Sequence, residues 1–275
     1  MDIYKISKEE WAKNSKIPFR VAEKDTDMHV EMARLMADVL KANNEQGKKT
    51  LIILPVGPIM QYEPFAKVIN EEKISLKNAW FVNMDEYLDS DDKWISYDTD
   101  LSFRAVMDRL LYSKIDEELL MPESQRLFPV PGKEAEIDAL IESFGGADIC
   151  LTGVGINGHI AFNEPPEKEV AITDEEFKNI GTRCLDIARE TIVNNGLRKV
   201  AGALDIFPRR CITLGMKQLL SSKVLKVYLY CDWQWGIARK IALGNETKDA
   251  PASFLQSHPN SEMIITKDLY DFMLK

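Results

Sequence analysis

The chain has few of the residues that build metal centres and disulfide frameworks. It contains four cysteines and three histidines in 275 residues. The cysteines form no Cys-x-x-Cys pair, and the histidines lie far apart without the spacing of metal ligands. We therefore expect no structural zinc, no other metal site and no disulfide framework.

Basic clusters and long apolar runs are also lacking. Lys and Arg total 35 against 44 Asp and Glu, which gives a net charge of −9. No basic stripe with aromatics is present, so we expect no nucleic-acid partner and no anionic membrane partner. The first residues form no apolar signal core, and no segment reaches the roughly 20 apolar residues of a membrane span. These features predict a cytoplasmic protein in which any anionic substrate needs a local basic pocket.

Apolar runs alternate with segments of helical periodicity along the whole chain. This alternation predicts a mostly parallel sheet with helices on both faces, folded as one domain over residues 1–275. The expected strands are 51–54, 79–84, 148–152, 211–214 and 225–230. A first helix is expected to begin after Asp25-Thr26-Asp27. Further helices are expected at 59–72, 101–111, 134–143, 184–194, 235–243 and in a short C-terminal stretch.

A glycine-rich segment follows the apolar run 148–152. Its glycines stand where a parallel strand ends, which lets the backbone approach a ligand closely. Their spacing matches the dinucleotide fingerprint, but Pro165-Pro166 would stop the uninterrupted helix that such a site needs. A tight turn with an incidental histidine fits the spacing equally well. The glycines are Gly153, Gly155 and Gly158.

Two motifs resemble those of the glucosamine-6-phosphate deaminases (isomerases). The segment from Gly153 to Pro165, Gly-Val-Gly-x-x-Gly-His-Ile-Ala-Phe-Asn-Glu-Pro, resembles the active-site signature of that family. The segment 83–87, Asn-Met-Asp-Glu-Tyr, is similar to its other hallmark. The similarity in layout runs from about residue 25 to the C-terminus. It implies an α/β three-layer sandwich with a modified Rossmann-like sheet and a reaction without cofactor or metal. The sequence leaves the oligomeric state open, and a homo-oligomer is one of the alternatives.

The resemblance assigns acid and base roles to residues of both motifs. Aldose–ketose conversion of an amino sugar needs ring opening and proton transfer between adjacent carbons, for which acid and base side chains suffice. By resemblance, Asp85 moves the proton from C2 to C1, His159 opens the ring, and Glu164 orients His159. Asn157 stands where the family has aspartate, so we expect a less basic His159. Glu86 is a candidate binding residue, with a structural contact as the alternative.

The expected phosphate site departs from the family pattern. The family loop after the first strand is Ser-Gly-Gly-Thr-like, whereas Pro55-Val56-Gly57-Pro58 lacks two backbone donors and every hydroxyl. Gln234 replaces a lysine, and Arg189 lies one residue out of register with the phosphate-binding arginine of the family. Substrate-binding candidates are therefore Gly57, Arg189, Gln234 and the three glycines of the second motif. Other candidate cations are Arg183, Arg239 and Lys240.

The charged, aperiodic stretch 165–183 follows the histidine motif. It fits a solvated loop or exposed helix, or a mobile lid, which the resemblance favours. Trp233 and Trp235 flank Gln234 and fit either sugar stacking or core packing. The leading function is isomerisation with deamination of an amino-sugar phosphate such as glucosamine or galactosamine 6-phosphate. The alternatives are 6-phosphogluconolactonase-like lactone hydrolysis, with His159 activating water, and sugar-phosphate binding without turnover.

Overall fold

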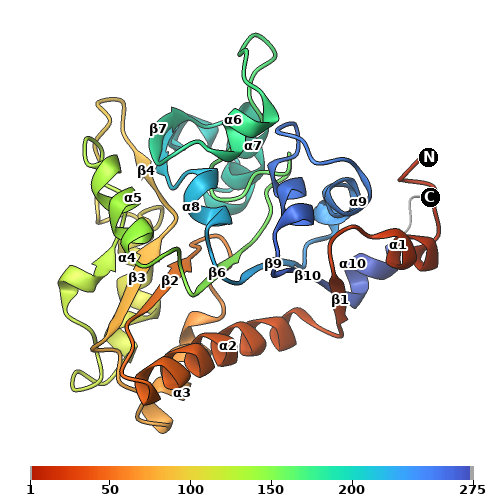
Figure 1. Cartoon of the computed structure of the whole chain (residues 1–275). Coiled ribbons are helices and arrows are strands. Elements are labelled where there is room, and N and C mark those ends of the chain that lie inside the picture. Colours follow the sequence, from red (N-terminus) through yellow and green to blue (C-terminus); the bar gives the residue numbers. More distant parts are fainter. Residues whose placement is uncertain (1, 273–275) are drawn as a thin grey trace.

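The computed structural model describes residues 2–272 and contains a large parallel sheet flanked by helices (Figure 1). Seven strands form this sheet in the order β1-β10-β9-β6-β2-β3-β5. All of its neighbouring pairs are parallel, as the sequence predicts. Its strands are β1 Phe19–Ala22, β2 Thr50–Leu54, β3 Ala79–Asn83, β5 Arg126–Leu127, β6 Ile149–Thr152, β9 Leu225–Leu229 and β10 Ser261–Thr266.

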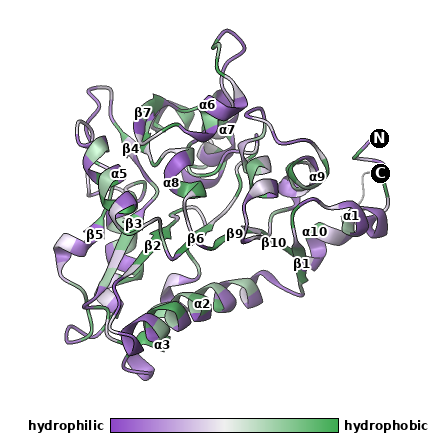
Figure 2. Ribbon diagram, in the orientation of Figure 1, coloured by the Kyte–Doolittle hydropathy of each residue, from purple (hydrophilic) through white to green (hydrophobic). Residues whose placement is uncertain are grey.

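Helices pack on both faces of the large sheet because its strands are buried on both sides. Ile52 and Leu54 of β2 belong to one apolar cluster, whereas Leu51 and Ile53 belong to the other. Figure 2 accordingly shows the central strands in the hydrophobic colour and the helices in both colours. The first cluster includes residues of α2 Asp25–Glu45, α3 Tyr62–Glu71 and α4 Phe103–Leu110. The second includes residues of α1 Lys8–Asn14, α5 Glu134–Ser143, α8 Met216–Leu220, α9 Trp235–Leu243 and α10 Lys267–Asp271.

The long helix α2 illustrates how the sequence pattern produces a layer. Met28, Met32, Met36 and Leu40 recur every four residues, and all four are fully buried. Asp25 and Asp27 lie in the first turn, where their negative charges stabilise the N-terminus of the helix through its dipole. The helix therefore lies along one face of the sheet with its apolar stripe inward (Figure 1).

A second, antiparallel sheet corrects two expectations. Its order is β4-β8-β7, with β4 Asp85–Leu88, β7 Arg183–Asp186 and β8 Arg210–Thr213. The run 211–214 is therefore wrongly placed in the parallel sheet by its apolar pattern. The expected helix 184–194 is also wrong at its start, because Arg183–Asp186 pairs with β8 and α7 begins only at Arg189. Pairing with a distant strand outweighs the local helical pattern here.

The order of the central strands places the ligand-binding edge of the fold. β9, β6, β2 and β3 are consecutive neighbours, and parallel strands present their carboxyl ends at one edge. The loops after these four strands therefore meet. The remaining helices are α6 Asp174–Lys178 and α7 Arg189–Lys199, with short 3-10 turns η1 Tyr112–Lys114, η2 Glu123–Gln125, η3 Leu204–Ile206, η4 Asp232–Gln234 and η5 Pro251–Ser257. Within residues 2–272, no helix combines the length and apolar character needed to cross a membrane.

Candidate active site

A cavity of about 410 Å³ opens at this edge of the sheet. Its wall contains residues from the loops after β2, β3, β6 and β9, together with residues of α7. This volume suits a small ligand such as a phosphorylated sugar. Both predicted motifs contribute, because Asp85 and His159 line the same cavity.

His159 is held by the loop that follows β6. Its Nδ1 lies 2.8 Å from Glu164 Oε2, 2.8 Å from Asn157 Oδ1 and 3.3 Å from Thr191 Oγ1 of α7. These acceptors favour the tautomer with the proton on Nδ1. The other ring nitrogen, Nε2, is then left with a lone pair for a ligand in the cavity.

Asn157 and Glu164 complete a closed triangle with the imidazole. Asn157 Nδ2 donates to Glu164 Oε2 at 2.7 Å while its Oδ1 faces the imidazole. Burial by itself raises the pKa of Glu164, but His159 and the hydrogen bonds from Asn157 and Thr191 outweigh it and lower that pKa. Glu164 is therefore ionised at neutral pH and holds the imidazole in one orientation.

The second glycine of the motif is required by the position of the ring. A Cβ atom at Gly155 would lie 2.0 Å from both Nε2 and Cε1 of His159. The third glycine, Gly158, has φ of +93° and packs against Ala250 rather than lining the cavity. Gly153 lines the cavity in ordinary backbone geometry. The glycine spacing thus serves a tight turn that carries an imidazole.

Asp85 lies at the point where the chain leaves the large sheet for the small one. It is 6% exposed and pairs with Thr213 across β4 and β8. Burial raises the pKa of the Asp85 carboxyl well above its usual range, and the adjacent carboxylate of Glu86 adds to the effect. A carboxylate whose pKa is raised is a stronger base than an exposed one.

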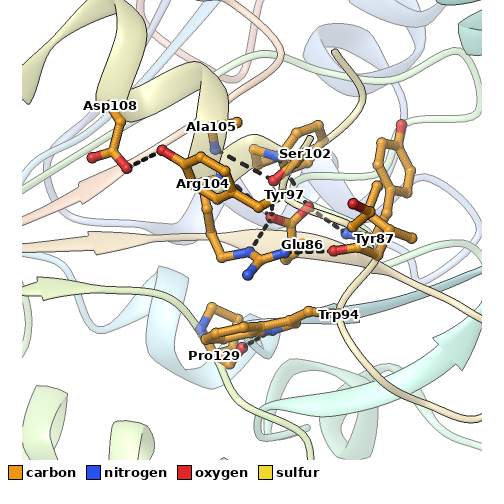
Figure 3. A network of polar contacts seen from close by, with 12 residues as sticks. Glu86, Tyr87, Trp94, Tyr97, Ser102, Arg104, Ala105, Asp108 and Pro129 are labelled. Atoms are coloured by element: carbon orange, nitrogen blue, oxygen red, sulfur yellow. Dashed lines mark hydrogen bonds and ion pairs between the residues drawn. The ribbon is translucent and has the colours of Figure 1, made fainter. Parts of the chain in front are cut away.

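Glu86 points into a separate polar network (Figure 3). It is fully buried and accepts hydrogen bonds from the backbone N–H groups of Tyr87, Phe103 and Arg104. The Arg104 guanidinium also donates to it at 3.0 Å and lies 4.5 Å from the ring centre of Trp94. Glu86 does not line the cavity, so its predicted place among the substrate-binding residues is not supported by position. It instead ties the strand carrying Asp85 to the start of α4.

The loop after β2 offers few donors to an anion. The carbonyl of Pro55 accepts a hydrogen bond from Tyr62, and that of Pro58 accepts one from Gln61 at 2.8 Å. Gly57 lines the cavity, and a Cβ atom there would meet nothing within 4 Å. The two prolines therefore fix this loop to α3 while removing two N–H groups from the cavity wall.

Gln234 lines the cavity, but its side chain fastens two loops together. Its Oε1 accepts from the N–H groups of Tyr230 and Cys231, and its Nε2 donates to the Val154 carbonyl at 2.8 Å. Of the neighbouring tryptophans, Trp233 lines the cavity and Trp235 is buried in the apolar core. The amide therefore works as a structural clamp where a lysine would supply charge.

The cations proposed from the sequence do not line the cavity. Arg183 donates to Asn163 at 2.8 Å, Arg239 is fully buried and donates to the carbonyls of residues 3 and 6, and Lys240 donates to the carbonyl of Asp249. Arg189 is exposed at the first turn of α7 and is also absent from the wall. No residue of 165–183 lines the cavity. Figure 1 shows the segment before α6 projecting away from the body.

The structure adds residues that the motifs did not identify. Asn194, Asn195, Arg198 and Lys199 of α7 line the cavity, and Thr191 contacts His159. Their three- and four-residue spacing from Thr191 onward is visible in the sequence as one helical stripe. Its orientation toward the cavity depends on tertiary packing. In residues 2–272, no group of three or more His, Cys, Asp or Glu has the arrangement of a metal site.

Comparison with known proteins supports the resemblance seen in the motifs. No family model matches the chain. A glucosamine-6-phosphate deaminase of a Geobacillus species (strain WCH70) is 30% identical over 247 residues, covering 86% of this chain and 90% of the relative. A glucosamine-6-phosphate deaminase of Clostridium perfringens is 26% identical over 247 residues, covering 88% and 96% respectively.

Solved structures agree on the fold. A monomeric glucosamine-6-phosphate deaminase superposes with a TM-score of 0.78 at 24% identity, covering 92% of this chain and 98% of the other. A 6-phosphogluconolactonase from Thermotoga maritima gives 0.62 at 19% identity, covering 91% and 99%. These similarities confirm the predicted three-layer α/β architecture. Together with the relative that is 30% identical along most of both chains, they show that this chain belongs to the glucosamine-6-phosphate deaminase family.

Proposed function

We propose that the protein isomerises and deaminates an amino-sugar phosphate by acid–base catalysis with Asp85 and His159. The observation that carries this proposal is the shared cavity, which is lined by a base with a raised pKa and by an oriented imidazole. Family membership supplies the substrate class, and the two side chains supply the proton transfers of ring opening and of the exchange between C2 and C1.

In the proposed reaction, His159 transfers the proton that opens the pyranose ring. Asp85 as carboxylate then removes the proton from C2 and returns it to C1, while the amino group loses a proton and O1 gains one, which converts the amino aldehyde to an imine at C2. Water hydrolyses this imine to a ketose and releases ammonia. Glu164 and Asn157 do not line the cavity, and they act by fixing the imidazole.

The test is a panel of phosphorylated and unphosphorylated amino sugars, including glucosamine and galactosamine 6-phosphate. Ketose and ammonia are measured together, because isomerisation with deamination releases them in equal amounts. Asp85→Asn removes the base with little change in volume, and we expect turnover to fall by about 10²–10⁴. Asp108→Asn, which changes a partly exposed carboxylate outside the cavity, is the matched control.

Three outcomes would contradict the proposal. Full activity of Asp85→Asn would remove the assigned base. Acid release from a sugar lactone, without ketose formation from any amino sugar, would identify lactone hydrolysis instead. Saturable binding of a sugar phosphate without turnover of any substrate in the panel would identify a binding protein.

A further inference from the structure

Two Asn-Gly dipeptides occur in the sequence, at Asn157-Gly158 and Asn195-Gly196. Asparagine is chemically most labile before glycine, because glycine has no Cβ atom to shield its backbone nitrogen from the asparagine side chain. Asn157 contacts His159 in the turn after β6, and Asn195 lines the cavity from α7. The fold decides which of the two dipeptides reacts.

The side-chain carbonyl of Asn157 is activated toward attack by a nucleophile. Its Oδ1 accepts a hydrogen bond from the backbone N–H of His159 at 3.3 Å and lies 2.8 Å from Nδ1 of the same residue. With the proton on Nδ1, two N–H groups face the oxygen on which negative charge develops when a nucleophile adds to Cγ. Donors in this arrangement stabilise a tetrahedral intermediate as an oxyanion hole does.

The nucleophile is the backbone nitrogen of Gly158, which closes a tight turn. Its N–H donates to the carbonyl of Gly155 at 3.0 Å, so this hydrogen bond must open before the nitrogen can turn toward Cγ of Asn157. Residues 156–158 belong to neither a helix nor a strand, and the neighbouring side chain of Ile156 is 38% exposed. The turn can therefore open without disrupting a regular element, and water reaches it.

The second dipeptide has the same two residue types in a helix. Asn195 and Gly196 lie in the middle of α7, and Gly196 is buried. A Cβ atom at Gly196 would lie 2.3 Å from the side chain of Leu204, which shows how closely this turn of the helix is packed. Rotation of the Gly196 nitrogen toward Asn195 would break helical hydrogen bonds and this packing. The helix therefore protects Asn195.

We propose that Asn157-Gly158 is a self-modification site, at which the folded protein converts the amide of Asn157 to the carboxylate of aspartate with His159 activating the carbonyl. The Gly158 nitrogen bonds to Cγ, the bond from Cγ to Nδ2 breaks, and Nδ2 leaves as ammonia with the proton that the Gly158 nitrogen gives up. Water then breaks the new bond between Cγ and nitrogen and leaves aspartate. Water that instead breaks the main-chain bond leaves isoaspartate.

The modification changes the reacting end of the cavity. Asn157 Nδ2 now donates to Glu164 Oε2 at 2.7 Å. Aspartate replaces that donor by a second negative charge beside the imidazole, which favours the protonated ring. Isoaspartate would insert a methylene group into the backbone two residues before His159. This inference goes beyond the proposed function and does not depend on the identity of the substrate.

The test follows both dipeptides in the full chain by peptide mass spectrometry during incubation in ¹⁸O-labelled water, which marks each newly formed carboxylate. In the folded protein we expect conversion at residue 157 to be at least about tenfold faster than at residue 195, since only the second site needs a helix to open. In urea the two sites should react at similar rates. Asn157→Gln is the matched control, because the longer side chain would have to form a larger ring and should keep its amide.

A second variant tests the activation by the imidazole. His159→Phe keeps a flat ring without the Nδ1–H group, so conversion of Asn157 should slow by about tenfold or more. Equal rates in His159→Phe and the parent protein would overturn the proposed activation.

Three further results would overturn the proposal. The first is an intact amide at residue 157 in the folded protein under conditions in which the urea-unfolded chain reacts. The second is equal conversion at residues 157 and 195 in the folded protein, which would place the reaction in the unfolded chain. The third is isoaspartate as the sole product. NMR distinguishes the two products, because the His159 signal of the incubated protein should move to its position in Asn157→Asp only if aspartate is formed.

Discussion

The two ends of the cavity are built in different ways. At the reacting end, His159, Glu164 and Asn157 belong to one short segment and hydrogen-bond to one another. At the other end, the loop after β2, Gln234 and the cations of α7 come from separate elements. Three side chains that hydrogen-bond to one another tolerate little change in any one of them. An anion-binding site needs only positive charge nearby, which several elements of the fold can supply. This difference explains how a chain can keep the reacting motifs of its family and lose the usual phosphate loop.

The largest effect on stability is expected for a substitution of Glu86, which holds the strand that carries Asp85. Glu86→Gln keeps the shape of the side chain but removes the charge that accepts hydrogen bonds from the Arg104 guanidinium and from three backbone N–H groups. Breaking a buried ion pair on one side should lower the free energy of unfolding by about 3 kcal/mol. Urea unfolding measures this change, and kcat reports whether Asp85 is displaced with it.

Asp108→Asn is the control for Glu86→Gln because its carboxylate accepts from the exposed Tyr97 at the rim of the same network (Figure 3). An exposed hydrogen bond contributes little to stability, so the control should unfold close to the parent protein. Equal effects of the two substitutions would mean that the buried network does not anchor this strand.

Sequence pattern predicted the reacting end better than the anchoring end for a physical reason. The turn around Gly155 and His159 is local, so the residue types that it needs lie next to one another in the chain. The placement of β8 beside β4 depends on pairing between distant segments, and an apolar run alone does not reveal its partner or direction. The same holds for Arg198. The sequence predicts its place on one face of a helix, but it does not show that this face lines the cavity.

A substitution that crowds His159 should lower kcat without changing the binding of phosphate. Gly155→Ala places a methyl group 2.0 Å from the imidazole, so the ring must move away from its position. A shift of this size should lower kcat by about 10²-fold, while binding of inorganic phosphate at the other end stays unchanged. Gly236→Ala is the matched control, since this residue of α9 does not line the cavity and a Cβ atom there approaches nothing closer than 3.9 Å. Loss of phosphate binding in Gly155→Ala would contradict the separation of the two ends.

The raised pKa that makes Asp85 a stronger base should also lower the free energy of unfolding of the protein. Its raised pKa means that the native state holds a proton which the unfolded chain releases above about pH 4. Stability therefore falls as pH rises from that value toward the native pKa, and Asp85→Asn removes this loss. We expect the free energy of unfolding to be higher in Asp85→Asn than in the parent at neutral pH, and this gain should disappear below about pH 4. A gain of equal size at pH 3 and pH 7 would show that the cause is packing rather than protonation.

The smallest effect is expected for Asn157→Asp, which restores the carboxylate that the family pattern has at this position. The new charge would stand beside Glu164, where Nδ2 of Asn157 now donates at 2.7 Å, and it would still face the imidazole. Two neighbouring carboxylates favour the protonated imidazole, so His159 should hold its proton to higher pH and turnover should change by only about tenfold or less. NMR titration measures this, with His29 and His258 as internal controls whose signals should not move. An unchanged His159 signal would mean that residue 157 does not tune the ring. A shifted signal with unchanged phosphate binding would show that the proton affinity of the reacting end is adjusted independently of the anchor.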